Sequence, residues 1–472
     1  MQGLHIFEPK TRTVIDLESF IPQDYLLRQI DRIVEPSFIR KLTASCYMDG
    51  KGRPSIDPVV YFRMVLVSYL YGIDKDRRLC DEVHFNLVYR WFCRLSLEDD
   101  VPDHSSFSRI RDRYGEEIYQ AVFREIVKRC AEHGLVGEKC CVMTDATLIP
   151  ADAALDSLVH NDPQQARQEA EALQGRTRAI EPPATRRISN QTHTSRTDPD
   201  ATLAQKRGTP RQLKYKVHQS IDANSRVILD THVTTGARHD NQPYLEQLQR
   251  IEARCRLTIV EAIADRGYGS AAIIRTLTEQ GKRTFIPLWS GRVGNSKHLK
   301  SGLVYEREQD HFRCPEGKYL TPNPSPYENY KRYVSSSEDC QMCSQASTCT
   351  AKRKKSSLSQ RFVLRSLDQD LFEDVQTRMR DPVFRQKISE RMWKIEGLFA
   401  EAKQNHGLSR ARYRGRSKVQ IQAYMSTTAQ NLKRLVKAFA CLLVVWWSRR
   451  KITATHSLHI LRIRTFSTRP TV

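Results

Sequence analysis

The sequence contains no hydrophobic run long enough to cross a bilayer as a helix. The longest run, AFACLLVVWW at 438–447, is about ten residues long, whereas a membrane-spanning helix needs roughly 20. The first residues, MQGLHIFEPKTRTVIDLESF, also lack the apolar segment of a secretory signal. We therefore expect a cytoplasmic protein whose twelve cysteines are free thiols or metal ligands rather than disulfides.

Acidic residues are missing from the last part of the chain. From Gln404 to Val472 there are 14 Lys and Arg residues and no Asp or Glu, so this segment supplies +14 of the formal net charge of +22. Such a basic protein suits a polyanion, and nucleic acid is the usual one. Because 419–447 has the pattern of an apolar helix, a solvated disordered tail fits poorly. Alternating basic residues in a glycine-broken stretch predict an arm that contacts phosphates; they are Arg410, Arg412, Arg414, Arg416 and Lys418.

Helical periodicity dominates residues 1–135, which we interpret as an all-helical DNA-binding domain. Apolar residues recur at helical spacing in DPVVYFRMVLVSYLYGI (57–73) and again in RRLCDEVHFNLVYRWFCRL (77–95). After the polar turn that follows, Asp103 or a neighbouring serine is the expected N-cap of another helix. Arg-rich helix faces suit DNA binding, although a dimerisation module has the same pattern.

From residue 136 the pattern becomes mixed α/β. CCVMTDATLIPADAA (140–154) predicts a strand that carries Asp145, and the polar segment 160–210 predicts an extended connection with little core. Two strands joined by a short turn then form a hairpin (213–235). A helix, a strand ending at Asp265, another helix and a last strand follow. This order predicts an α/β domain whose first strands are antiparallel, and α/β sheets bind ligands at strand ends such as Asp265.

A third carboxylate lies on a later helix, RMWKIEGLFAEAK (391–403). Four apolar residues at helical spacing predict its packed face: Met392, Ile395, Phe399 and Ala402. Glu396 lies beside this face, and Lys403 follows on the same side. A solvated surface glutamate is the ordinary interpretation of such a position.

Three carboxylates from separate elements, Asp145, Asp265 and Glu396, suffice for phosphodiester cleavage. Two divalent ions about 3.5–4 Å apart need shared carboxylate oxygens to activate water and stabilise a leaving 3′ oxygen, and Mg²⁺ takes only one or two protein carboxylates besides phosphate. Spacing alone does not select this triple, because a chain of this length offers many.

Eight segments, in chain order, carry a more specific signal. They are SIDPVVYFRMVLVSYLYGI, RRLCDEVHFNLVYRWFCRL, PDHSSFSRIRDR, TDATLIPADA, SRTDPDATL, YKVHQSID, ADRGYGS and KIEGLFAEAKQNHGLSRARYRG. Together they cover about 50–435, and the chain resembles the DDE transposases of bacterial insertion sequences, in the branch with a helical N-terminal domain and a cysteine-bearing insertion.

The resemblance implies a ribonuclease-H-like catalytic fold whose acidic triad is Asp145, Asp265 and Glu396. This triad would hold two Mg²⁺ or Mn²⁺ ions. Lys403 matches the lysine that the family places seven residues after its glutamate. Related transposases often have Tyr and Arg seven and four residues before the glutamate. Ser389 and Met392 occupy these positions here, so neither role is assigned; either Arg391 is an alternative for the arginine or this branch does not use the motif.

Five nearby residues have competing interpretations. Asp152 follows Asp145 by seven residues, but the motif TDATLIPADA favours Asp145. Glu261 is expected on the other side of the strand that ends at Asp265. His239 and Asp240, in GARHDNQP, resemble a recurrent family element, which we interpret as supporting or structural. His218 is interpreted as a structural strand histidine.

Four cysteines form a C-x25-C-x2-C-x5-C pattern: Cys314, Cys340, Cys343 and Cys349. The CxxC pair is a common zinc-chelating unit, but the spacing is irregular for a zinc ribbon. A structural Zn²⁺ site, reduced free thiols and an iron–sulfur cluster therefore stay open. KRKK (352–355) follows directly, which suggests a small knob that touches DNA. The other cysteines are expected in cores.

The expected protein is a transposase associated with the nucleoid. It binds the terminal inverted repeats of its own element, cleaves the strand at each end and joins the 3′-OH to target DNA, as a homodimer in a synaptic complex. After residues 1–135, the predicted parts are a catalytic core in two pieces (136–290 and 366–435), a cysteine-bearing basic insertion (291–365) and a basic tail (436–472). The alternatives are a ribonuclease-H-like nuclease without strand transfer and an inactive DNA-binding regulator.

Overall fold

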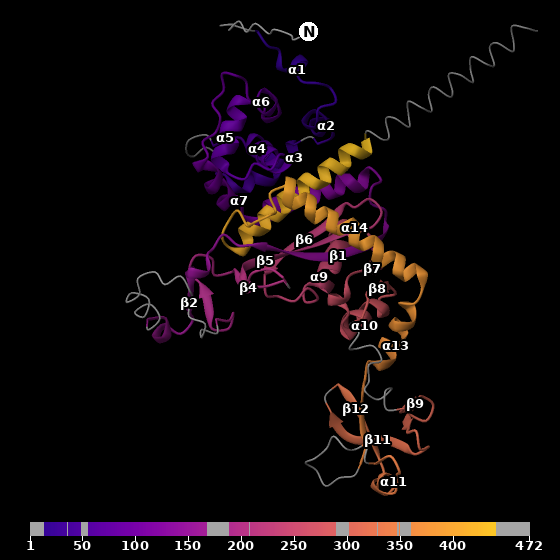
Figure 1. Cartoon of the computed structure of the whole chain (residues 1–472). Coiled ribbons are helices and arrows are strands. Elements are labelled where there is room, and N and C mark those ends of the chain that lie inside the picture. The colour runs from indigo at the N-terminus through magenta and orange to yellow at the C-terminus, as the bar shows by residue number, and fades with distance from the viewer. Residues whose placement is uncertain are drawn as a thin grey trace, which may run out of the picture.

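The computed structural model describes most of the chain in three successive parts: helical, sheet-based and a small distal lobe (Figure 1). The described residues are 14–34, 36–48, 55–167, 188–206, 208–288, 302–327, 329–346, 349 and 360–439.

Short and long helices form the N-terminal part. They are α1 (Leu17–Phe20), α2 (Leu26–Ile33), α3 (Ser37–Thr43), α4 (Pro58–Leu70), α5 (Asp76–Phe85), α6 (Leu87–Cys93) and α7 (Ser105–Glu132). Helix α4 begins where Asp57 accepts a hydrogen bond from Val59 N (2.8 Å) and Pro58 occupies the first turn. Almost every later residue of α4 is buried, so it is the central helix. Helix α7 kinks at Gly115, whose φ of 62° is not helical.

The stretch 77–95 forms two helices, not the single helix that its apolar pattern suggested. Asn86 ends α5 and caps α6, because its Oδ1 accepts hydrogen bonds from Val88 N (2.9 Å) and Tyr89 N (3.2 Å). Apolar periodicity continues across this cap, and so it conceals the break.

A six-stranded sheet is the centre of the molecule. Its strands are β1 (Lys139–Pro150), β4 (Thr202–Ala204), β5 (Gln212–Asp222), β6 (Ile228–Thr235), β7 (Thr258–Ile263) and β8 (Arg283–Phe285). The order is β4-β5-β1-β7-β8, with β6 also pairing with β5. Strands β6, β5 and β1 are antiparallel, while β7 and β8 run parallel to β1. Helix α9 (Tyr244–Cys255) leads from β6 to β7, and α10 (Ala271–Glu279) supplies the parallel crossover to β8.

A helix over 416–439 covers the free edge of β6 with buried amide side chains. Asn431 accepts from Ile228 N and donates to Ile228 O, both at 2.9 Å. Gln420 accepts from Val233 N (2.6 Å) and donates to Thr231 O (3.0 Å). These side chains satisfy backbone groups that would otherwise be open to another strand. The expected helix is present, but its buried face is partly polar; residues 440–447 lie outside the described residues.

The distal lobe is a second sheet inserted between β8 and the last part of the chain. Its strands are β9 (Val304–Glu306), β10 (His311–Arg313), β11 (Tyr319–Tyr327), β12 (Tyr330–Ser335) and β13 (Phe362–Ser366), in the order β13-β12-β11-β10-β9. Helix α11 (Ser337–Gln341) follows β12. Figure 1 shows the lobe set apart from the central sheet, below α13 (Gln369–Arg378). Helix α14 (Pro382–Asn405) then returns to the central sheet.

The predicted mixed α/β architecture with a helical N-terminal part is confirmed, as is the hairpin of β5 and β6. The connection over 160–210 has more structure than expected where it is described. It contains β4 and the separate pair β2 (Leu158–His160) and β3 (His193–Ser195), and Asp198 is fully buried. In the described part of the chain, no helix is long and apolar enough to cross a membrane.

Candidate active site

Asp145 on β1 and Asp265 just after the end of β7 stand at the same level of two neighbouring parallel strands. In the pairing of β1 with β7, Met143 lies opposite Ile263, and each aspartate follows its strand residue by two positions. Because adjacent strands are about 4.8 Å apart, the two carboxylates lie side by side. Asp265 also starts the turn after β7, where its Oδ1 accepts a hydrogen bond from Gly267 N (2.7 Å).

Asp145 already has a cation beside it. Its Oδ2 lies 2.8 Å from Nη1 of Arg391 on α14, and the two side chains are 17% and 8% exposed. Burial raises the pKa of Asp145, the charge of Asp265 raises it further, and Arg391 opposes both effects. The structure therefore places Arg391, the alternative to the family arginine, directly on a predicted catalytic carboxylate.

Glu396 follows Arg391 by five residues on α14 and is exposed. At 100° per residue it points about 140° away from Arg391 around the helix axis, but only about 20° away from Lys403, so it lies on the Lys403 side of α14. Ile395, Phe399 and Ala402 are buried as expected. The prediction that Met392 packs with them is wrong, because that side chain is 54% exposed.

Asp240 is a further carboxylate beside the aspartate pair. A Cβ placed on Gly267 would lie 2.9 Å from Oδ1 of Asp265 and 3.9 Å from Oδ2 of Asp240, so both carboxylates flank the same glycine. Lys216 holds Asp240, with Nζ 2.7 Å from Oδ1. The loop GARHDNQP, predicted to be supporting or structural, thus contributes the charged side chain of Asp240 at the site.

Two buried polar side chains without hydrogen-bond partners in the described structure adjoin these carboxylates. The hydroxyl of Tyr268 is one, and its pKa is raised by burial and by the charges of Asp240, Asp145 and Asp265. The amide of Gln219 is the other. Gln219 lies opposite Asp145 in the register of β1 with β5, and opposed residues share a face of the sheet. The motif YKVHQSID contains Gln219, but the sequence analysis gave this residue no role, although the hairpin register could have found it.

Lys403 is anchored on β1 close to Asp145. Its Nζ donates to Thr147 Oγ1 at 2.8 Å and approaches Leu148 O at 3.4 Å. Burial lowers the pKa of Lys403, and the charges of Lys206 and Lys214 lower it further. Several cationic groups therefore lie together beyond the aspartates.

The residues that the sequence offered as alternatives to the predicted triad have other partners in the structure. Glu261 lies 2.7 Å from Lys387 of α14, and Asp152 pairs with two arginines of the 410–418 segment. His218 is fully buried, with Nε2 3.0 Å from Thr234 Oγ1, as expected for a structural strand histidine.

Two models of transposase families match the sequence. A Transposase domain (DUF772) matches residues 15–113, and a Transposase DDE domain matches residues 313–436. The chain is a DDE-type transposase. Its DDE match contains Glu396 and Lys403, whereas Asp145 and Asp265 lie between the two matched ranges.

Solved transposases show only a distant likeness to this chain. A piggyBac transposase synaptic complex with hairpin DNA is 9% identical, with 94% of this chain and 85% of that chain covered, at a TM-score of 0.30. A Mos1 transposase paired-end complex with left transposon end is 11% identical, with 50% and 61% covered, at a TM-score of 0.15. No match is found among the curated proteins.

The predicted DNA-binding arm of this transposase is partly engaged within the protein. Arg410 and Arg414 pair with Asp152 at 3.2 and 3.3 Å, but each side chain is more than half exposed. Lys418 pairs with Asp112 (2.8 Å). Arg416 is exposed.

Arg412 departs from the predicted arm. Its guanidinium lies 4.4 Å from the ring centroid of Tyr69, and Nη1 donates to Ser68 Oγ (3.0 Å). Arg412 therefore ties the segment to α4 and does not suit a phosphate contact. The segment 410–418 is interrupted by glycine and has no periodicity that marks a buried face, so the sequence does not indicate that Arg412 points inward.

The predicted cysteine set converges on one cavity of about 390 Å³ in the distal lobe. Each of Cys314, Cys340, Cys343 and Cys349 is free and half-buried. Residues 352–355, expected to form a basic knob beside them, lie outside the described residues.

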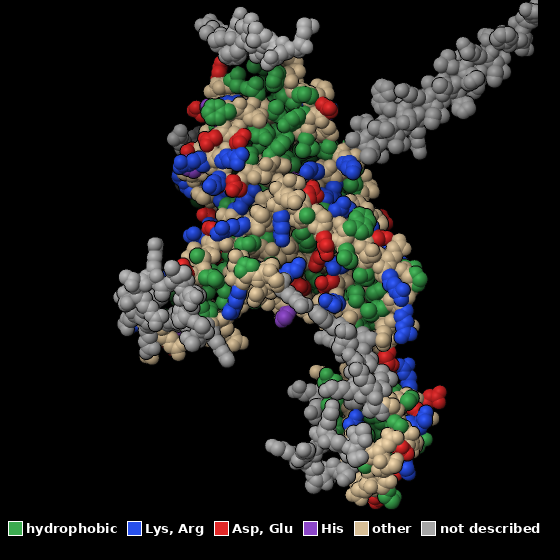
Figure 2. All heavy atoms as spheres, viewed as in Figure 1, with side chains coloured by type: hydrophobic (Ala, Val, Ile, Leu, Met, Phe, Trp, Pro, Cys, Tyr) green, Lys and Arg blue, Asp and Glu red, His purple; other side chains and the backbone are tan. Residues whose placement is uncertain are grey.

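The carboxylate site suits a divalent cation in donor chemistry but is not assembled as a three-ligand group. Asp145 and Asp265 offer the oxygen donors that Mg²⁺ prefers, and the Arg391 guanidinium shows that positive charge is accepted there. In the described residues, however, no three His, Cys, Asp or Glu side chains are grouped closely enough to hold a metal ion. On the face in Figure 2, acidic side chains gather over the central sheet with Lys and Arg on both sides.

Proposed function

We propose that this transposase binds double-stranded DNA at terminal inverted repeats and catalyses metal-dependent strand cleavage and strand transfer. The observation that carries the proposal is the side-by-side placement of Asp145 and Asp265 under α14, the helix that bears Glu396 and lies within the DDE match. A ribonuclease-H-like catalytic domain is part of the proposal. It is supported by three antiparallel strands followed by two parallel ones with a helical crossover.

Asp145, Asp265 and Glu396 are the residues that would hold Mg²⁺ or Mn²⁺. When bound, such ions activate water and stabilise the leaving 3′ oxygen. Arg391 pairs with Asp145 and opposes the rise in the pKa of this carboxyl that burial causes. Lys403, anchored on β1, offers a cation to a DNA phosphate beside the aspartates.

Affinity for DNA would come from exposed cations around the site. Arg410, Arg414 and Arg416 are exposed on the segment after α14, and contacts of this kind make binding fall steeply with salt. Both element ends must be held together for transfer, so we expect a homodimer in the synaptic complex.

The deciding experiment is cleavage of a labelled duplex that carries one terminal repeat, with Mg²⁺, by the wild type and by Asp265→Asn. Strand-specific cutting at the repeat boundary, lost in the variant while DNA binding persists, supports the proposed chemistry. Joined donor–target products then separate a transposase from a nuclease, which yields cut ends alone. Binding without cleavage by both proteins would indicate a regulator.

A further inference from the structure

The distal lobe has a small hydrophobic core for a separate five-stranded unit. Its buried apolar side chains are Leu303, Phe312, Leu320, Tyr333 and Val363. A core of this size rarely stabilises a unit by more than about 3–5 kcal/mol, and natural domains this small are usually stapled by disulfides or a metal. Every described cysteine is free, so a disulfide does not supply the staple in the described part of the lobe.

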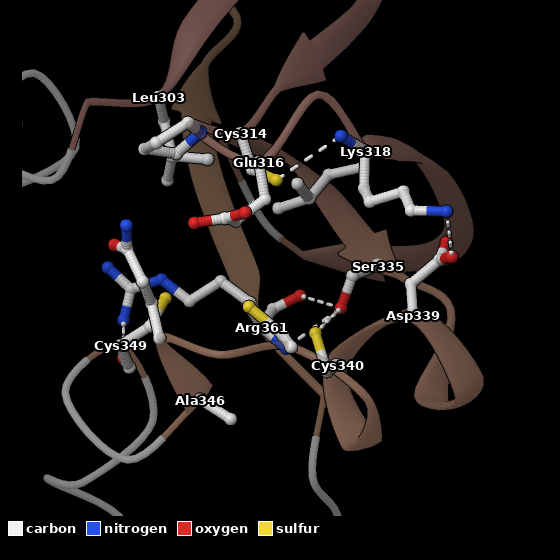
Figure 3. A pocket seen from close by; sticks show the side chains of 14 residues that line it. Leu303, Cys314, Glu316, Lys318, Ser335, Asp339, Cys340, Ala346, Cys349 and Arg361 are labelled. Carbon is white, nitrogen blue, oxygen red and sulfur yellow. Dashed lines mark hydrogen bonds and ion pairs between the residues drawn. The ribbon is translucent and has the colours of Figure 1, made fainter.

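The lobe instead brings four thiols to one cavity from two distant segments. Cys314 comes from the turn between β10 and β11, whereas Cys340 lies in α11 and Cys343 and Cys349 follow it. Figure 3 shows Cys314, Cys340 and Cys349 on different walls of this cavity. The fold, rather than sequence proximity, gathers the irregularly spaced cysteines.

Hydrogen-bond donors approach the sulfur atoms. Lys318 N lies 3.3 Å from Cys314 Sγ, and the same turn is closed by Cys314 N donating to Lys318 O (2.8 Å). The Ser335 hydroxyl lies 3.0 Å from Cys340 Sγ, and either atom of this pair can be the donor. A backbone donor aimed at sulfur, as at Cys314, stabilises the thiolate, which is the form that ligates metals, and orients the ligand.

We propose that Cys314, Cys340, Cys343 and Cys349 bind one structural Zn²⁺ ion that staples the distal lobe. Four thiolates in a tetrahedron are a closed structural zinc set, with Zn–S distances of about 2.3 Å. In the described residues, no group of His, Cys, Asp or Glu side chains is preassembled to hold a metal ion. The side chains therefore turn inward as the ion binds, and four thiol protons are released to solvent.

Metal analysis of the purified full-length chain tests this inference. We expect about one zinc per chain, falling at least tenfold in Cys340→Ser and in Cys343→Ser. The matched control is Cys80→Ser, which changes a half-buried cysteine outside the lobe and should retain full zinc. Zinc retained in the cluster variants, or iron with visible absorption in the wild type, overturns the proposal.

Two further measurements protect the test from a folding failure. Wild type stripped of metal and titrated with Co²⁺ should develop the intense absorption of a tetrahedral cobalt–thiolate centre at one equivalent. Chelation should also speed amide exchange in β11 and β12 without changing β1 and β5, because the staple is local. Neither readout depends on DNA cleavage. A chain that takes up no Co²⁺ and shows no local exchange change refutes the site.

Discussion

Replacing Arg391 with methionine removes one charge of a buried pair and leaves Asp145 uncompensated. The two side chains are 8% and 17% exposed, so solvent screens the loss only weakly. Removing one member of such a pair costs about 3–5 kcal/mol. In the Asp145→Asn background the partner charge is absent. There Arg391→Met should cost only roughly 1 kcal/mol of stability, chiefly from lost packing and hydrogen bonding. The double-mutant cycle should therefore give a coupling free energy of about 2–4 kcal/mol.

Amide exchange in β1 and β7 is the appropriate assay, because a multipart chain does not unfold in one step. Arg391→Met should speed exchange there by roughly two to three and a half orders of magnitude, since about 1.4 kcal/mol corresponds to tenfold. Arg385→Met is the matched control, an exposed arginine on the same helix, and should change little. Additive costs of Arg391→Met and Asp145→Asn would refute the view that the two charges stabilise each other.

Three other substitutions test separate contacts. Asn431→Leu strands the buried N–H and C=O of Ile228, so we expect a loss of about 2–4 kcal/mol and faster exchange of the Ile228 amide; unchanged exchange would contradict the edge contact. Lys403→Gln should lower the steepness of salt-dependent DNA binding by about one unit if Lys403 reaches a phosphate, whereas an unchanged slope removes it from the interface. Burial alone raises the pKa of Glu401, but hydrogen bonds led by that from His406 bring it below its ordinary value. Its stabilisation is therefore present above the unfolded pKa and lost as pH falls through the lowered folded pKa. The melting temperature of Glu401→Gln should be lower than that of wild type at neutral pH and converge with it in acid; a constant difference would contradict the charge argument.

The positions of Asp145 and Asp265 were predictable from sequence because strand–turn patterns are local. Asp145 lies within an alternating strand pattern, and Asp265 follows an apolar run and precedes a glycine-containing turn, which marks the end of a strand. The short turn after Asp222 likewise fixed the hairpin. These features depend on residues within a few positions of one another, and the structure has each of them.

Features that depend on distant packing could not be read in this way. Asn431 and Gln420 have polar side chains that are usually exposed, yet both are buried because they bind the backbone at the edge of β6. The inward turn of Arg412 likewise depends on α4, which is more than 300 residues away in the chain. The pairing of Arg391 with Asp145 depends on how α14 is rotated against the sheet.

That rotation links the parts of the site. Helix α14 is tied to β7 through Lys387 and Glu261 and to β1 through Arg391 and Lys403. These contacts hold the helix at three points, and Glu396 is exposed between the second and the third. Any cation that takes over the charge of Asp145 competes with Arg391, and so it also releases the middle tether of α14. By linkage, a shift of α14 that loosens the pair of Arg391 with Asp145 must favour binding of that same cation to an equal extent. The Arg391–Asp145 pair is therefore the contact through which the charge at Asp145 and the position of α14 depend on each other.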